Sequence, residues 1–268
     1  MVSEWLGADP GRCGWSAERD RERPRCWEAF LGSLRADPPE HGVAKLQVTG
    51  PLTLAAALEG RAGGSGVARS DVGLVREVAA WVAASAASQV RALAELGVDA
   101  LVVVDEPSLE ALVPPVAVTT AAWGPLRAAT PTWGLHVCCD VPWPLVEEAG
   151  PAVVSFDATL PGALSRAAKP LARLLRRGTR VAWGVLSPGG EGGTAKGAAA
   201  LADGLAGLSA RGVHAEQALA PSLVTGGCGT GVATLDRELV LAPALAAVAA
   251  AARSRAGAEG ASPVEVAR

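Results

Sequence analysis

The sequence predicts an α/β protein whose strands run parallel. Short apolar runs alternate with longer helix-forming stretches six times along the 268 residues, as in a succession of right-handed βαβ units. The run 100–105 is apolar along nearly its whole length, which is typical of a parallel strand covered on both faces. In folds of this class the reactive residues lie at the carboxyl ends of the strands.

Periodicity and turn residues define the individual elements. Pro51 occupies the first position of a helix, and Gly97 ends a long helix as a C-terminal cap. The loop 60–66 is expected to be flexible because it is rich in glycine. The predicted strands are 43–49, 100–105, 135–138, 152–157, 180–186 and 217–223. The predicted helices are 16–36, 52–58, 70–96, a short one after Ser108, 141–149, 161–177, 194–211 and 235–252.

These elements divide the chain into three parts. Residues 1–42 are expected to form an N-terminal arm and a helix, and residues 43–254 the α/β domain. Residues 255–268 consist mainly of alanine, glycine, serine, glutamate and arginine, and this composition predicts a disordered tail.

Composition excludes several classes of protein. A formal net charge of −3 with 19% charged residues gives no nucleic-acid footprint, so no nucleic-acid partner is expected. Five irregularly spaced cysteines argue against a disulfide framework and for a reducing compartment. We identify no signal peptide, and the longest apolar run, 239–252, is too short to cross a bilayer. These features predict a cytoplasmic protein with no membrane partner.

The stretch 134–140 carries the strongest indication of chemistry. His136 and Cys138 are two residues apart on a predicted strand, so they point to the same side. Zinc binds neutral imidazole and thiolate in a tetrahedral shell, and Cys228 is the obvious third ligand, with Asp157 a possible fourth. A buried cysteine is often only a small apolar residue, but all four candidates fall at or just past predicted strand ends. Thr49, Asp105 and Ser187 occupy equivalent positions.

Several of these residues also have purely structural interpretations. Asp105 could cap the helix begun by Pro107, and Asp157 could equally be a cap or a solvated loop residue. Glu106 could pair with a neighbouring basic residue. Cys139 points to the opposite side of the strand from Cys138 and is expected in the core.

Other conspicuous residues receive no assigned role. Cys13 and Cys26 precede the α/β domain, and His41 and His214 are expected to be solvated. The stretch 189–196 lacks the glycine before and the hydroxyl residue after its lysine that a nucleotide-binding phosphate loop requires. The tryptophans that could either wall a substrate pocket or simply be buried are Trp133, Trp143 and Trp183.

Four motifs together resemble a known family. Lys-Leu-Gln-Val-Thr-Gly-Pro-Leu-Thr at 45–53, Asp-Glu-Pro-Ser-Leu at 105–109, His136-Val-Cys138 and Cys228-Gly229 follow one another in this order. The chain between about residues 43 and 235 therefore resembles the catalytic barrel of cobalamin-independent methionine synthase, in the superfamily shared with uroporphyrinogen decarboxylase. The resemblance implies a TIM-type (β/α) barrel and a zinc-dependent methyltransferase that methylates the thiol of homocysteine.

The resemblance also implies roles for particular residues. His136, Cys138 and Cys228 would bind zinc, with Asp157 in the place of the family's glutamate ligand. Asp105 would be the catalytic residue that holds the amino group of the substrate. We further expect Glu106 and Ser187 to bind substrate.

The chain departs from the family in two respects. Aspartate in place of glutamate at residue 157 could still bind zinc or leave that position to water. Only six of eight barrel strands are recognisable, and neither the Gly-Ser strand end nor the glutamate of the family's first strands is found in residues 1–42. The barrel is then shortened, begun too far downstream in the gene model, or built on unrecognised first strands.

The sequence is compatible with more than one methyl donor and more than one activity. The family's separate N-terminal domain is not found, so the donor partner is expected to be either a folate or, as in short relatives, a corrinoid protein. A barrel that has lost catalysis and a thiol alkyltransferase with a different donor are the alternatives to a methionine synthase-like enzyme.

Overall fold

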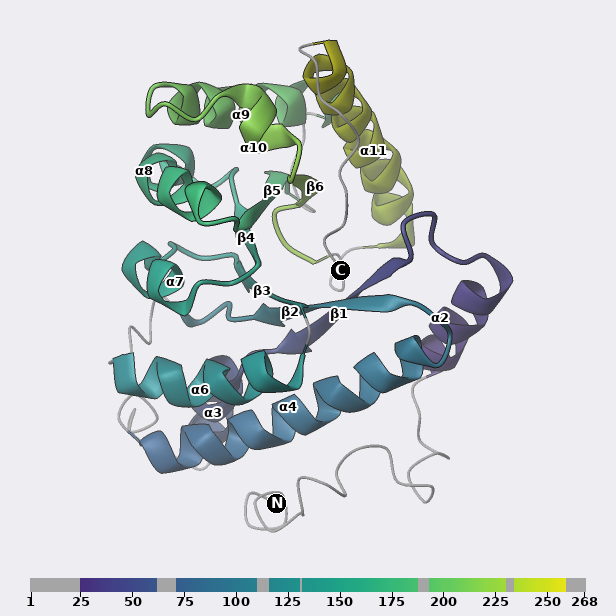
Figure 1. The fold of residues 1–268 in the computed structure, drawn as a ribbon, viewed down its shortest axis with the longest axis vertical. Helices are drawn as coiled ribbons and strands as arrows, with labels where there is room; N and C mark the ends of the chain where they lie inside the picture. The colour runs from purple at the N-terminus through teal and green to yellow at the C-terminus, as the bar shows by residue number, and fades with distance from the viewer. Residues whose placement is uncertain are drawn as a thin grey trace. The chain divides into compact units, whose positions relative to one another are not determined.

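The computed structural model describes residues 25–61, 71–109, 116–130, 132–187, 193–229 and 234–258. Strands and helices alternate along these ranges, and every strand pairing given below is parallel, so the predicted α/β class is confirmed (Figure 1). The chain divides into two compact units, Met1–Leu135 and His136–Arg268. Strand β3, Thr132–Val137, carries the boundary between them. None of the described helices combines the length and hydropathy that a membrane-spanning segment requires.

The N-terminal unit is built around a pair of parallel strands. Strand β1 (Val43–Thr49) pairs with β2 (Asp99–Asp105) in a register that sets Thr49 opposite Asp105 at the carboxyl ends. The helices described in this unit are α2 (Arg25–Ala36), α3 (Pro51–Arg61), α4 (Val72–Ala94) and α6 (Val116–Ala129).

The long helix α4 follows directly from its sequence. Asp71 caps its first turn by accepting a hydrogen bond of 3.0 Å from the backbone N–H of Leu74. Gly97 has a φ of 70°, and this left-handed conformation stops the helix from continuing, as predicted. The helix packs against α6 (Figure 1). Its buried face comprises Val75, Val78, Ala79, Val82, Ala83, Ala86 and Leu93.

Successive parallel strands run through the described part of the C-terminal unit. Strand β4 (Val153–Asp157) pairs with β5 (Arg180–Leu186), which pairs with β6 (Leu223–Gly226). The helices are α7 (Trp143–Ala149), α8 (Ala163–Arg176), α9 (Gly193–Ser209), α10 (Ala215–Leu219) and α11 (Leu235–Ala258). Helices α8 and α9 both pack on β5 (Figure 1).

Aromatic side chains fill the core of this unit. Phe156 makes an edge-on contact with Trp143 at 5.5 Å between ring centroids and lies 5.8 Å from Trp183. Trp183 is completely buried and donates a hydrogen bond from Nε1 to Ser222 Oγ. Trp133 is also buried, beside Trp123 in the N-terminal unit. Burial in the core therefore explains the three tryptophans considered as pocket walls.

The structure corrects two of the predicted elements and contains one helix that was not predicted. The strand predicted at 217–223 is wrong: 215–219 is helix α10, and the strand begins only at Leu223. The backbone N–H of His214 donates to Gln217 Oε1 at the start of α10, a capping contact that favours a helix there. Helix α11 continues to Ala258, so the tail expected from residue 255 cannot begin before 259. A 14-residue helix, α6, lies beyond the short helix expected after Ser108.

The other expected elements lie close to their predicted positions. Strands β1 and β5 have the predicted bounds, and β2, β3 and β4 agree to within three residues. Residues 16–24 of the first expected helix and 62–66 of the expected loop lie outside the described residues, as do 259–268. Residues 43–254 were expected to form a single domain, whereas the chain divides into two compact units after Leu135. The single domain stays a prediction.

Candidate metal centre

Strand β3 and the turn after it supply two of the candidate ligands. His136 is the penultimate residue of β3 and is 7% exposed, whereas Cys138 follows the strand end at Val137 and is half-buried. The predicted strand thus extends one residue beyond the observed end of β3. The two residues remain on one side because the chain is still extended between them.

Cys228 reaches the same place because the chain after β6 approaches β5 very closely. The backbone N–H of Gly227 donates a 2.8 Å hydrogen bond to the carbonyl of Leu186 at the end of β5. A Cβ on Gly184 would lie 2.7 Å from the Cα of Gly227, so this approach requires that β5 position to be glycine. The absence of side chains at Gly184 and Gly227 lets the loop that bears Cys228 lie against β5.

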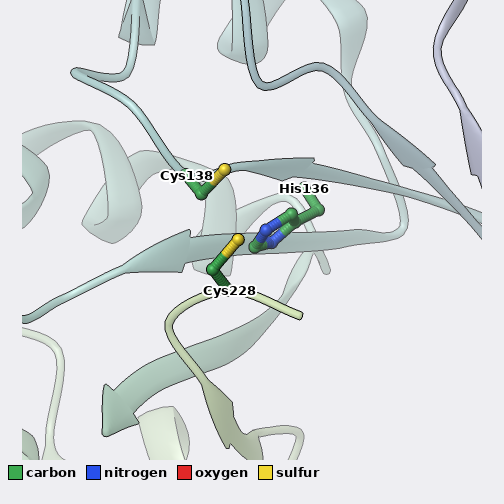
Figure 2. Close-up of side chains that lie close together, drawn as sticks. All are labelled: His136, Cys138 and Cys228. Atoms are coloured by element: carbon green, nitrogen blue, oxygen red, sulfur yellow. The ribbon is translucent and has the colours of Figure 1, made fainter. Parts of the chain in front are cut away.

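The three predicted soft ligands converge. One ligand atom from each of His136, Cys138 and Cys228 lies within 4.8 Å of the other two. The imidazole and both sulfur atoms lie close together and come from two segments, β3 with the turn after it and the loop after β6 (Figure 2). Tetrahedral zinc with its usual bond lengths keeps such ligand atoms about 3.3 to 3.8 Å apart, so small side-chain rotations would suffice to bind an ion.

Ser155 on β4 orients the imidazole. His136 Nδ1 and Ser155 Oγ lie 2.9 Å apart, and both residues are buried. While this hydrogen bond is kept, metal coordination by His136 would use Nε2. Sequence reasoning missed Ser155, although strand alternation places it on the same side of β4 as Asp157.

The two thiols interact directly. Burial, the hydrogen bond with the Cys228 thiol and the charges of Cys228 and Cys139 together raise the pKa of Cys138 to about 12. Two sulfur atoms this close cannot both be thiolates without a cation between them. A divalent metal ion supplies that positive charge and binds thiolate in preference to thiol. The donor set, one imidazole and two thiols, therefore fits a soft or borderline metal ion.

Asp157 does not belong to this converging group. Its Oδ1 accepts hydrogen bonds from the backbone N–H and the hydroxyl of Thr159 at 2.8 and 2.6 Å. The carboxylate also lies against Gly227, where a Cβ would fall 2.7 Å from Oδ2. Its predicted metal-binding role stays a prediction, and in the structure it connects the ends of β4 and β6.

Asp105 and Glu106, the substrate-binding residues predicted after β2, lie in the N-terminal unit. Asp105 Oδ2 accepts a 2.5 Å hydrogen bond from Gln47 Nε2, and Gln47 Oε1 accepts one of 2.8 Å from Lys45 Nζ. Burial lowers the pKa of Lys45, and the negative charge of Asp105 opposes that shift. A polar row thus runs along β1 to the end of β2.

Glu106 is fully buried, and its carboxylate accepts four hydrogen bonds. It accepts hydrogen bonds from the backbone N–H groups of Leu52 and Thr53, the hydroxyl of Thr53 and Trp123 Nε1. A Cβ on Gly50 would lie 2.1 Å from its carboxyl carbon. These contacts give Glu106 a structural role at the start of α3, and its predicted role in substrate binding stays untested.

The other residues considered from the sequence lie outside the converging group. Ser187 follows β5 and lines a pocket in the C-terminal unit. Cys139 is half-buried and is not part of the converging group. His41 and His214 are exposed, as predicted. No model of a known protein family matches the chain, and no curated protein matches it either.

Proposed function

We propose that the chain is a zinc-dependent S-methyltransferase that acts on homocysteine or a similar small thiol. The convergence of His136, Cys138 and Cys228 is the observation that carries the proposal. A catalytic zinc site typically has three protein ligands and an open position, whereas a structural site is closed by four. Cys228 is exposed, so a fourth ligand could arrive from solvent.

Zinc bound to these residues would lower the pKa of a substrate thiol and so provide a thiolate nucleophile near neutral pH. The chain's own residues would hold the ion and fix its surroundings. His136 would be kept in one orientation by Ser155, while the raised pKa of Cys138 keeps a proton there until a cation replaces it. In the reaction the thiol would lose its proton, its sulfur would bond to the methyl carbon, and the donor would keep the electron pair of the broken bond.

The finer features of the proposal rest on the resemblance. The fold would be a shortened TIM-type barrel, the substrate amino group would bind Asp105, and the donor would be a methylated folate or corrinoid protein. A reducing compartment such as the cytoplasm would keep the thiols available for metal.

A metal-binding protein without turnover is the second candidate. The observation that favours it is the state of Glu106, which is buried and saturated with internal hydrogen bonds. One of the predicted substrate contacts is therefore committed to the fold.

Metal content tests the centre itself. Elemental analysis of protein purified under reducing conditions should find about one zinc ion per chain. His136→Ala and Cys228→Ser should lose it, whereas Cys139→Ser is the matched control because Cys139 adjoins the group without belonging to it. A metal-free wild type, or full zinc retention in both ligand variants, would defeat the proposal.

Turnover separates the two candidates. Zinc-loaded protein is incubated with homocysteine and other small thiols, together with methyl-folate or methylcobalamin, and the S-methyl product is measured by mass spectrometry. Product that disappears in Cys228→Ser but persists in Cys139→Ser supports the enzyme. Stoichiometric zinc with no product from any donor supports the metal-binding protein.

A further inference from the structure

A pocket of about 130 Å³ lies in the C-terminal unit at the carboxyl end of β5. Leu186 and Leu241 form part of its apolar wall, and Ser187 and Thr159 contribute hydroxyl-bearing side chains. A pocket at a strand carboxyl end, with apolar walls and few polar groups, is the usual setting of a small-molecule site.

Two cationic side chains from different helices line this pocket. Lys196 comes from the first turn of α9 and Arg237 from the first turn of α11. No aspartate or glutamate is found among the described residues that line it. Lys196 and Arg237 each also interact with other groups of the protein. Two positive charges at one apolar-walled pocket attract an anion and repel a cation.

The start of α9 adds to this potential. Gly193, its first residue, also lines the pocket, so the positive end of a 17-residue helix dipole lies there. The arrangement is distinct from a nucleotide-binding phosphate loop, whose sequence pattern is lacking around Lys196.

The volume limits what can bind. An engineered cavity of about 150 Å³ accommodates benzene, and pockets for drug-sized ligands measure about 300 to 1,000 Å³. A pocket of about 130 Å³ therefore holds one small group rather than a whole nucleotide or folate. A carboxylate or a phosphate has the required size and charge.

Three hydrogen bonds and one packing contact link the pocket to the segment that bears Cys228. Thr159, a lining residue, bonds to Asp157, whose carboxylate lies against Gly227. Leu186, another lining residue, accepts from the N–H of Gly227, which directly precedes Cys228. Occupancy of the pocket can thus affect the position of Cys228.

We propose that the pocket between Lys196 and Arg237 is an oxyanion site that binds the carboxylate or phosphate group of a small molecule. This proposal does not rest on methyl transfer or on zinc. The competing interpretation is that the two side chains only cover apolar surface with their methylene stems.

Direct binding to the full chain tests the site. Inorganic phosphate and acetate are titrated separately into wild-type protein at constant ionic strength, with chloride as the competing anion, and binding is followed by calorimetry. Saturable binding of phosphate, acetate or both supports the site and identifies the preferred group. Absence of saturable binding by either anion overturns it.

Variants locate the binding. Lys196→Gln and Arg237→Gln should each weaken binding at least about tenfold, as expected for loss of a charge-assisted hydrogen bond. Lys169→Gln on α8 and Arg253→Gln on α11 are matched controls on exposed positions and should bind like wild type. Binding that survives in both pocket variants places the anion elsewhere and overturns the proposal.

Two further measurements distinguish anion binding in this pocket from binding to a metal ion and from loss of binding through unfolding. His136→Ala, which lacks a proposed metal ligand, should bind the anion as wild type does, and loss of binding there would mean that the anion binds metal. In unmodified protein, the preferred anion should slow acylation of Lys196 but not of Lys169, measured by mass spectrometry. Equal slowing at both lysines would contradict a site at Lys196.

Discussion

The carboxylate of Asp157 lies directly against the backbone of Gly227, so that a Cβ added to Gly227 would fall 2.4 Å from Oδ1 and 2.5 Å from Cγ. Real Cβ atoms do not approach other atoms this closely, and the carboxylate is held in place by Thr159. Only glycine at residue 227 permits the segment bearing Cys228 to lie where it does.

Replacement of Gly227 by alanine should therefore displace Cys228. We expect Gly227→Ala to lower the free energy of unfolding by about 1 to 3 kcal/mol, the usual cost of overpacking, and to reduce bound zinc. Gly229→Ala is the matched control because nothing lies within 4 Å of a Cβ built there. Thermal unfolding and metal analysis measure both effects. Equal zinc content in the two variants would show that the contact does not position Cys228.

Ser155 should matter for metal affinity although it is not a ligand. Ser155→Ala removes the hydrogen-bond partner of His136 Nδ1, and the loss of such outer partners typically weakens metal binding by about 10- to 100-fold. Competition with a chromophoric chelator measures the affinity. Ser209→Ala, at the exposed end of α9, serves as the control, and equal affinities in the two variants would remove Ser155 from the centre.

Zinc binding should release protons because of the raised pKa of Cys138. With a pKa of about 12 this thiol is protonated throughout the neutral range in metal-free protein, and coordination requires its thiolate. The apparent affinity should therefore rise at least about tenfold per pH unit from neutral pH upward. Calorimetry in buffers of different ionisation enthalpy measures the proton release. Cys138→Ser should release fewer protons than Cys139→Ser, and identical release would contradict the assignment.

Local sequence pattern was sufficient for most of the fold. β1 lies between Gly42 and Gly50, and β5 lies between Gly178 and Pro188, so the turn residues and the apolar runs between them located both strands. The pattern failed at 215–226 because Gln217 to Leu223 contains apolar residues without clear alternation. A side-chain contact between Gln217 and the backbone of His214 decides in favour of a helix.

The candidate site was only partly accessible to sequence reasoning. Alternation within one strand predicted that His136 and Cys138 share a side, and the position of Cys228 after a predicted strand indicated a third ligand. The role of Ser155 depends on how two separate segments pack, and a serine within a buried strand carries no signal of its own. Glu106 was expected to bind substrate or to pair with a basic residue, yet its hydrogen bonds come from α3 and α6.

Two carboxylates should show opposite pH dependence when replaced by glutamine. Burial raises the pKa of Glu106 above 4.5, so the folded protein binds its proton more tightly than the unfolded chain does, and the contribution of Glu106 to stability is lost as pH rises above about 4.5. The hydrogen bond from Arg173 lowers the pKa of Glu147, so its contribution is present above about 4.5 and lost as pH falls.

Glu106→Gln should consequently destabilise most at acidic pH, and Glu147→Gln most at neutral pH. Glu106→Gln also places an amide donor against backbone N–H groups that need an acceptor, which adds a pH-independent cost of about 1 to 3 kcal/mol. Urea unfolding of wild type and both variants from pH 4 to 8 separates these contributions. Because the other titrating groups are common to all three proteins, their effect cancels in the difference from wild type. A penalty for Glu106→Gln that grows with pH would mean that the four hydrogen bonds to its carboxylate outweigh burial, and that Glu106 is ionised in the folded protein.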